Sequence, residues 1–329
     1  MTNNTRLTRR ALAAGAAALV ATPAILRAQP AWPEKPITFL NPFPAGGGTD
    51  TFARPLAGKL SEALGQQVLV DNKGGAGGTV GASQAAKLKP DGYTFFIGAV
   101  HHTIAPNIYK TLDYDLEKAF VPITMLALVP QVVSINPQRL PVDTLAAFVE
   151  YAKKNPGKVN FASPGAGTAH HLAGELFKLI TKTDLTHVPF RGAGPAMQDL
   201  LAGQVDMMFD GMGTSSTQIR AGKLKGLAVA TKERLSEFPT IPTGAEAGAP
   251  GWEVSTWYGM WGIAGTPQPI LDRIYAETKK ALALPDMVKI WKEQVASPGG
   301  ESPADFAKRI RSEIEKWAKV VKDADVKLN

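Results

Sequence analysis

One stretch decides the fold: Ile37-Thr38-Phe39-Leu40-Asn41-Pro42-Phe43-Pro44-Ala45-Gly46-Gly47-Gly48-Thr49-Asp50. Its first five residues have the apolar pattern of a strand, and residues 51–64 have the pattern of a helix. Three consecutive glycines between them lack Cβ atoms, so backbone N–H groups can turn toward a small ligand. Thr49 and Asp50 are residue types that favour a helix N-cap. Because the N–H groups of a helix N-terminus bind anions, the stretch predicts an anion-binding loop.

The loop does not fit the two common nucleotide-binding patterns. A P-loop has Lys directly after its last Gly, whereas Thr49-Asp50 follow here. The Rossmann spacing G-x-G-x-x-G is absent, since positions 49–51 are Thr, Asp and Thr. Asp50 would also repel a polyphosphate. A carboxylate therefore suits the loop better, with a purely structural turn as the alternative.

Residues 1–28 have the pattern of a secretory signal peptide. Arg6, Arg9 and Arg10 precede an Ala-rich apolar run over residues 11–25, and the small Ala28 stands at the expected cleavage point. The run is too short for a stable membrane anchor. We therefore expect export to the periplasm. The Arg9-Arg10 pair raises the twin-arginine route as one of two alternatives.

Composition excludes several classes of protein. The net charge of +7 falls to +3 without the four arginines of residues 1–28, which argues against a nucleic-acid partner. The chain has no cysteine, so disulfides and Cys-based metal or redox sites are excluded. We expect no metal and no cofactor. About 300 remaining residues are enough for two domains.

Short apolar segments alternate with amphipathic segments beyond residue 30. The expected strands are 37–41, 67–72, 93–99, 158–162, 186–190, 207–209 and 225–230. The expected helices are 51–64, 78–87, 145–155, 168–180, 194–201, 215–221, 268–283 and 303–322. Such alternation predicts an α/β fold of βαβ units with mainly parallel sheets. Ligands bind such sheets beyond the carboxyl ends of the strands.

Two longer apolar stretches, 125–135 and 256–264, interrupt this alternation. Each is too long for one parallel strand of a small sheet, and together they fit two crossings of the chain between two lobes. This pattern predicts one lobe from residues 30–130 plus 253–329 and a second lobe from residues 131–252. Two lobes hinged by two strands can close on a ligand. Two sequential domains divided near Pro141 are the alternative.

Polar residues and glycines recur where other expected strands end. His101 and His102 follow one strand, but adjacent side chains diverge, so a pocket histidine fits better than a metal site. Arg191, followed by Gly192, could hold a carboxylate with its planar fork. Asp210 could accept a hydrogen bond at another strand end. The segment 163–168 offers hydroxyls and exposed backbone through Ser163, Gly165, Gly167 and Thr168.

Catalysis is the less favoured interpretation of these residues. A periplasmic serine hydrolase would use Ser163 or Thr168 with a nearby histidine. Ser163 lacks the G-x-S-x-G elbow, however, and no spacing marks an acid as the third partner. We therefore expect a binding protein and not an enzyme. The aromatic side chains of Phe43, Trp257 and Tyr258 could line its pocket, with core packing as the alternative.

Several ordered motifs along the chain resemble the Bug family, the periplasmic substrate-binding proteins of tripartite tricarboxylate transporters. The motifs are Trp32-Pro33-Glu34-Lys35-Pro36-Ile37, 42–50, 70–78, Pro90-Asp91-Gly92-Tyr93-Thr94, Val188-Pro189-Phe190-Arg191-Gly192, 199–206 and 242–248. The resemblance implies a two-lobed periplasmic-binding-protein fold, type II-like, whose two crossover strands form the hinge. It also implies a monomer that captures a small di- or tricarboxylate or aromatic carboxylate for membrane permease subunits. A sensor subunit for a signalling receptor is the alternative.

The resemblance also implies which residues contact the ligand. The loop matching 43–50 holds one carboxylate, and the second lobe's strand-end loops hold the other end. The expected ligand-binding residues are Phe43, Ala45, Gly46, Gly47, Thr49, Asp50, His101, His102, Ser163, Gly165, Gly167, Thr168, Arg191, Gly192 and Asp210. The chain departs from the family pattern at Phe190, where a tyrosine is common, and at the His101-His102 pair. Both departures concern the identity of the ligand.

Overall fold

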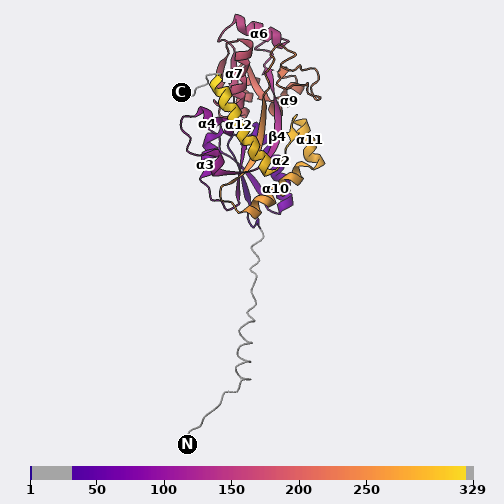
Figure 1. The fold of residues 1–329 in the computed structure, drawn as a ribbon. Coiled ribbons are helices and arrows are strands. Elements are labelled where there is room, and N and C mark those ends of the chain that lie inside the picture. The colour runs from indigo at the N-terminus through magenta and orange to yellow at the C-terminus, as the bar shows by residue number, and fades with distance from the viewer. Residues whose placement is uncertain (2–31, 324–329) are drawn as a thin grey trace.

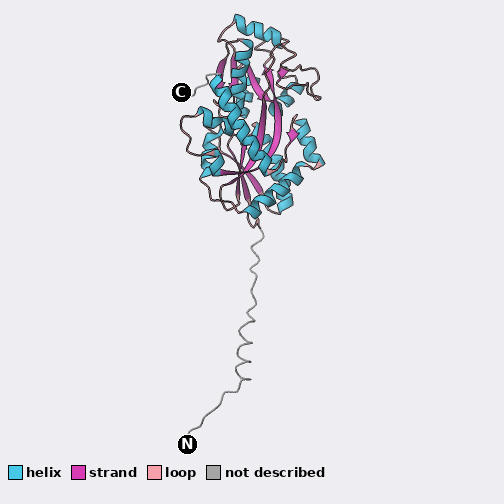
Figure 2. Cartoon of the chain, viewed as in Figure 1, coloured by secondary structure: helices cyan, strands magenta, loops and turns pink. Residues whose placement is uncertain are grey.

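The computed structural model describes Met1 and residues 32–323, and the expected signal peptide therefore lies outside the described residues apart from Met1. Among the helices that the model describes, none is long and apolar enough to cross a membrane. The chain forms an α/β structure in which strands run between layers of helices (Figures 1 and 2).

Eight of the described strands lie side by side in one hydrogen-bonded sheet, in the order β2-β1-β3-β9-β4-β7-β5-β6. Strands β8 and the short β10 pair with β4 off this path. The strands are β1 (Ile37–Asn41), β2 (Val68–Asn72), β3 (Thr94–Ala99), β4 (Phe120–Ile135), β5 (Asn160–Ser163), β6 (Thr186–Pro189), β7 (Met207–Gly211), β8 (Lys225–Val229), β9 (Ser255–Ile263) and β10 (Ser297–Pro298). Strand β1 is parallel to β2 and β3, and β5 is parallel to β6 and β7, as the alternating pattern predicts.

The two long apolar stretches form the antiparallel strands β4 and β9, which pair with each other along residues 120–130 of β4. Beyond Gln131, strand β4 pairs with β7 and β8 instead. The 16 residues of β4 therefore belong to two sheets in turn. Long buried strands of this kind tie two lobes together, and β4 runs lengthwise through the molecule in Figure 1.

Helices cover both faces of the sheets. They are α2 (Gly48–Leu64), α3 (Thr79–Ala86), α4 (His101–Ile108), α5 (Leu116–Ala119), α6 (Leu145–Lys154), α7 (Ala169–Thr181), α8 (Ala193–Leu201), α9 (Met212–Arg220), α10 (Gln268–Leu282), α11 (Pro285–Glu293) and α12 (Pro303–Asp323), with a 3-10 turn η1 (Ala76–Gly78). The sequence pattern missed α4, α5 and α11. Helix α4 begins directly after β3, so it turns the predicted end of a strand into a helix N-terminus.

The last helix shows why these segments fold as the pattern predicts. Ser302 Oγ accepts a hydrogen bond from the Asp305 N–H at 3.1 Å and caps α12. The predicted apolar stripe of α12 packs into the core, where Phe306 and Ile310 are fully buried. Helix α12 crosses the molecule diagonally in Figure 1 and contacts both α4 and β4.

Candidate functional site

The strand-end loops meet around a small cavity of about 10 Å³. It is lined by Phe43, Gly47, Gly48, Thr49, His101, Pro164, His170, Ala193, Thr214 and Tyr258. These residues come from segments on both sides of the crossing strands. The cavity therefore lies where the two sets of parallel strands face each other, as the rule for open α/β sheets predicts.

Five helices place their N-terminal turns at this cavity. Seven of the ten lining residues belong to the first turn of α2, α4, α7, α8 or α9, or directly precede one of these helices, whereas Phe43, Pro164 and Tyr258 do not. The first N–H groups of a helix have no partner within the helix, and its N-terminus carries a partial positive charge. Five such termini at one cavity favour a bound anion, although no Lys or Arg is among the residues that line it.

The glycine loop, residues 42–50, leads into α2. This helix begins at Gly48, about one turn earlier than predicted. The N-cap is Gly47 and has no side-chain cap, so Thr49 and Asp50 lie in the first helical turn. At Gly48, a Cβ atom would lie 1.9 Å from the Tyr258 hydroxyl oxygen. Gly48 is thus required by the close approach of Tyr258 and not by an unusual backbone angle. Burial and then the charge of Asp210 raise the pKa of Tyr258, so its hydroxyl stays protonated and can donate a hydrogen bond.

Asp50 holds the glycine loop together from behind. Its Oδ2 accepts hydrogen bonds from the Gly46 N–H at 3.0 Å and from Arg54 Nε at 2.8 Å. Its Oδ1 accepts one from Asn72 Nδ2 at 3.1 Å. Burial alone would raise the pKa of Asp50, but the bonds from Arg54, Gly46 and Asn72 outweigh burial and lower it. The carboxylate is therefore charged and already bound by protein donors.

Segments of the two lobes contact each other directly beside the cavity. A Cβ atom on Gly192 would lie 2.6 Å from Pro44 Cδ, and one on Gly194 would lie 2.9 Å from the Ala45 carbonyl oxygen. The start of α8 therefore packs against the glycine loop without room for a side chain. The Tyr109 hydroxyl lies 3.1 Å from the Ala166 carbonyl oxygen in a second such contact.

The two adjacent histidines have different roles. His101 lines the cavity, and its Nδ1 accepts a hydrogen bond from the Ala169 N–H at 3.0 Å. Burial, together with His170 and His102, lowers the pKa of His101 well below its usual value. The proton of the neutral ring is then on Nε2, which makes His101 a neutral hydrogen-bond donor. His102 does not line the cavity. Its ring contacts the backbone of Ala99, and burial lowers its pKa to about 4.

The segment 163–168 is held by its own hydrogen bonds. Ser163 Oγ accepts from the Gly165 N–H at 3.2 Å, and Thr168 Oγ1 donates to the Gly165 carbonyl oxygen at 2.8 Å. The Gly167 N–H donates to His171 Nδ1 at 3.2 Å. Pro164 is the residue of this segment that lines the cavity.

Ser163 also lies 2.6 Å from His187 Nε2, which is the geometry that a serine hydrolase would need. Ser163 is completely buried, however, and burial followed by the charges of His171 and Lys178 lowers the pKa of His187 to about 3. Such a histidine is a poor general base at neutral pH. His187 instead stacks on His171 with a ring separation of 4.0 Å, so the pair supports the loop.

Asp210 is fully buried behind the cavity. Its Oδ2 accepts hydrogen bonds from the Thr214 hydroxyl and from Ser215 Oγ at 2.7 Å. Its Oδ1 has no hydrogen-bond partner among the described residues and lies 3.5 Å from His170 Nε2. Asp210 therefore has one free oxygen beside a histidine that lines the cavity.

Arg191 is exposed and is not among the residues that line the cavity, so its contact with a ligand carboxylate stays a prediction. Five residues that line the cavity were not among the ligand-binding residues expected from the sequence: Gly48, Pro164, His170, Ala193 and Thr214. Tyr258, considered only as an aromatic wall, lines it too. The signal for Gly48, Ala193 and Thr214 was available, because each lies in the first turn after a strand-end glycine.

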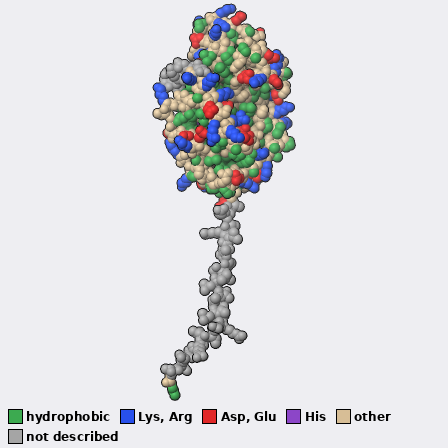
Figure 3. Space-filling view, viewed as in Figure 1, with side chains coloured by type: hydrophobic (Ala, Val, Ile, Leu, Met, Phe, Trp, Pro, Cys, Tyr) green, Lys and Arg blue, Asp and Glu red, His purple; other side chains and the backbone are tan. Residues whose placement is uncertain are grey.

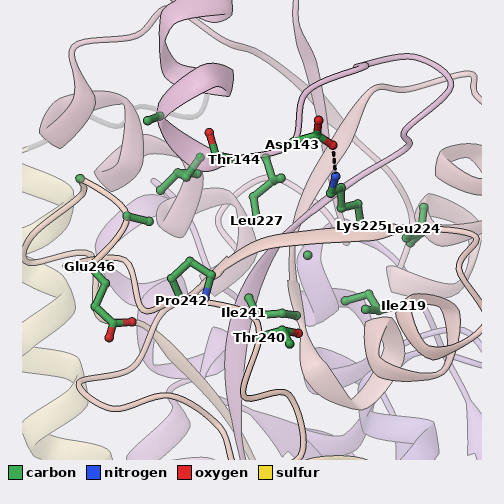
Figure 4. A pocket seen from close by; sticks show the side chains of 15 residues that line it. Asp143, Thr144, Ile219, Leu224, Lys225, Leu227, Thr240, Ile241, Pro242 and Glu246 are labelled. Carbon is green, nitrogen blue, oxygen red and sulfur yellow. Dashed lines mark hydrogen bonds and ion pairs between the residues drawn. The ribbon is translucent and has the colours of Figure 1, made fainter.

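A larger groove lies elsewhere, on the segment 131–252 (Figure 4). This distal groove has a volume of about 860 Å³ and is lined by 15 residues, including Asp143, Leu145, Ile219, Leu227 and Ile241. Its floor is apolar, and Lys225 at its edge is paired with Asp143. It lacks the convergence of helix N-termini seen at the small cavity.

On the face shown in Figure 3, positive and negative side chains are interspersed, as the modest net charge predicts.

Two lobes joined by crossing strands, with helix N-termini from both facing one cavity, define a periplasmic solute-binding protein. A family model described as tripartite tricarboxylate transporter family receptor matches residues 52–326. The chain belongs to this family, and the Bug-family resemblance is confirmed. It is 39% identical over 320 residues to a UPF0065 protein of Pseudomonas sp. strain P51, covering 95% of this chain and 94% of the relative. It is 36% identical over 299 residues to protein BugT of Bordetella pertussis, covering 90% and 91%.

Solved structures agree with this assignment. The periplasmic binding protein BugD superposes with a TM-score of 0.86 at 36% identity, covering 90% of this chain and 99% of that chain. An R. palustris protein with adipate superposes with a TM-score of 0.87 at 36% identity and the same coverage. MatC from Rhodopseudomonas palustris, with bound malate, superposes with a TM-score of 0.84 at 34% identity, covering 88% and 100%. The predicted two-lobed fold is therefore confirmed.

Proposed function

We propose that this protein captures a small carboxylate in the cavity between its lobes and delivers it to the permease subunits of a tripartite tricarboxylate transporter. The observation that carries the proposal is the convergence of five helix N-termini on one cavity. Two relatives were solved with dicarboxylates, adipate and malate, which makes a dicarboxylate the first class to test. The same proposal takes the protein to be exported to the periplasm and to act without catalysis.

The electrostatics favour a carboxylate over a neutral ligand. Each helix N-terminus contributes about 0.3–1 kcal/mol to the binding of an anion, so five contribute roughly 1.5–5 kcal/mol. Micromolar affinity needs about 8 kcal/mol. Hydrogen bonds from the free N–H groups of α2 and α8, from His101 Nε2 and from the Tyr258 hydroxyl are available for the remainder. A neutral ligand of the same shape would lose the contribution of the helix N-termini.

The ligand enters when the lobes separate. A cavity of about 10 Å³ offers the room of one water molecule, and a dicarboxylate is several times larger. We propose that residues 30–130 with 253–329 move as one lobe and residues 131–252 as the other. The change of pairing partner along β4, between Pro130 and Gln131, supports this division. The hinge then lies in β4 and at the start of β9.

Binding of a panel of carboxylates to the purified mature chain tests the proposal. The panel contains malate, succinate, adipate, citrate, benzoate and a neutral diamide matched to adipate. We expect at least one carboxylate to raise the melting temperature and to bind with micromolar or better affinity by calorimetry. The diamide should not bind. Any bound ligand is first removed by unfolding and refolding the protein. If this protein then binds none of the carboxylates, the proposal is wrong.

A further inference from the structure

We propose that His170 takes up a proton when a carboxylate enters the cavity, so that capture of the anion is coupled to capture of a proton. The inference deepens the proposed function and rests on it. It concerns the negative charges of the site, namely those of Asp210 and of the ligand carboxylate, which the helix N-termini alone do not neutralise.

The site already contains a negative charge and no cation to balance a second one. Asp210 is fully buried, and its Oδ1 has no hydrogen-bond partner among the described residues. None of the residues that line the cavity is Lys or Arg, and Arg54 is already paired with Asp50. A carboxylate ligand therefore brings a second anion close to Asp210. Two anionic groups in one buried site repel each other. The uptake of one proton by the site then costs less free energy than this repulsion.

His170 is placed to receive this proton. It lines the cavity, is 3% exposed, and its Nε2 lies 3.5 Å from Asp210 Oδ1. Its Nδ1 is buried without a hydrogen-bond partner among the described residues. A protonated imidazole donates from both nitrogens. One N–H then faces Asp210 and the other is available to the ligand, so both orphaned atoms are satisfied.

The other titratable groups around His170 do not replace it. His101 packs against the ring at 5.3 Å, but its Nδ1 already accepts the Ala169 N–H, and protonation would break that bond. Tyr258 also lines the cavity and is neutral. Without ligand, burial lowers the pKa of His170 below its usual value, although the charge of Asp210 opposes this. A ligand carboxylate adds a further charge of the same sign as Asp210, which raises this pKa.

Proton uptake has a defined pH signature. Between the pKa of His170 in the free protein and its higher pKa in the complex, each bound carboxylate takes up close to one proton. The dissociation constant then increases up to tenfold for each pH unit of increase. Above the higher pKa the uptake vanishes and affinity becomes independent of pH.

Calorimetry of the wild-type protein measures this uptake without any variant. The probe is the panel carboxylate that gives the largest thermal shift, titrated at pH 6.0–8.5 in phosphate, HEPES and Tris, whose ionisation enthalpies differ. We expect the apparent enthalpy to depend on the buffer with a slope of up to one proton taken up. A slope of zero at every pH, with clear binding, overturns the inference and leaves the proposed function intact. Absence of binding by the whole panel overturns both.

Two variants identify the group. His170→Gln keeps an amide donor near Asp210, and we expect weaker binding with no buffer dependence. Asp210→Asn removes the negative charge that favours a protonated His170, so we expect less proton uptake and a weaker decrease of affinity with increasing pH than in wild type. If His170→Gln takes up as many protons as wild type, another group is the acceptor and the inference is wrong. Circular dichroism and melting curves of both variants confirm that they are folded.

Discussion

Gly192→Val tests whether the observed contact between the lobes is the binding-competent arrangement. Gly192 has extended backbone angles, φ 161° and ψ 167°, which a valine adopts without strain. Its Cβ would nevertheless lie 2.6 Å from Pro44 Cδ and 2.9 Å from Pro44 Cγ. Pro44 belongs to the glycine loop across the cavity. The substitution therefore blocks the approach of the two lobes and leaves the interior of each unchanged.

The expected loss of affinity follows from this overlap. Forcing extra methyl groups into a packed contact costs about 1–3 kcal/mol. If that cost applies only to the closed arrangement, the dissociation constant increases about 5- to 150-fold. Valine is also a poorer N-cap than glycine, so the free energy of unfolding should fall by about 1 kcal/mol or less.

Calorimetry with the best panel carboxylate gives the affinity, and chemical unfolding without ligand gives the stability. Gly58→Ala is the matched control, because it lies inside α2 and its Cβ would meet nothing within 4 Å. It should stabilise the helix by about 0.5–1 kcal/mol and leave affinity unchanged. An affinity of Gly192→Val within twofold of wild type would refute the assignment of this contact to the bound state.

Three further changes test other parts of the site. Asp50→Ala removes the acceptor that fixes the Gly46 N–H, so we expect at least tenfold weaker binding in calorimetry; unchanged binding would show that the loop holds its shape without it. His101→Phe leaves the buried Ala169 N–H without an acceptor, so the free energy of binding should weaken by about 1–3 kcal/mol. The free energy of unfolding without ligand should change less. Equal losses in the two free energies would contradict a role of His101 in closure of the lobes. Acidification should destabilise the fold, because the folded-state pKa values of all five histidines lie below the usual value. These are His101, His102, His170, His171 and His187. The unfolded chain binds more protons between about pH 4 and 6.5, so stability is full above that range and decreases as pH falls through it, by up to about 1.4 kcal/mol per pH unit for each group. Urea midpoints that do not change between pH 7 and 5 would contradict this burial.

The sequence predicted those parts of the fold that depend on local pattern. Helix α12 has a cap at Ser302 and a complete apolar stripe, and both are present in the structure. The long stretches at β4 and β9 were recognised as crossings because neither has the length of an ordinary strand. Helix α4 was missed because it has only eight residues with Pro106 inside it, and its apolar residues look like the continuation of β3.

The site was predictable only as a set of loops. Backbone loops at strand ends were located because the topology of parallel sheets brings them together. Tyr258 could not be placed against Gly48, since that contact depends on the register of β9, where Tyr258 pairs with Ala99. The position of a long side chain on a loop also cannot be predicted from local pattern, and Arg191 is exposed in the structure.

A structure of the protein with the best panel carboxylate tests the central claim most directly. We expect the carboxylate between the N-termini of α2 and α8, with Tyr258, His101 and His170 as neighbours. We expect the cavity to be wider than the one observed, with the contact between Gly192 and Pro44 at its edge retained. A carboxylate bound only in the distal groove of residues 131–252, or bound at the cavity without contact to either helix N-terminus, would contradict the account.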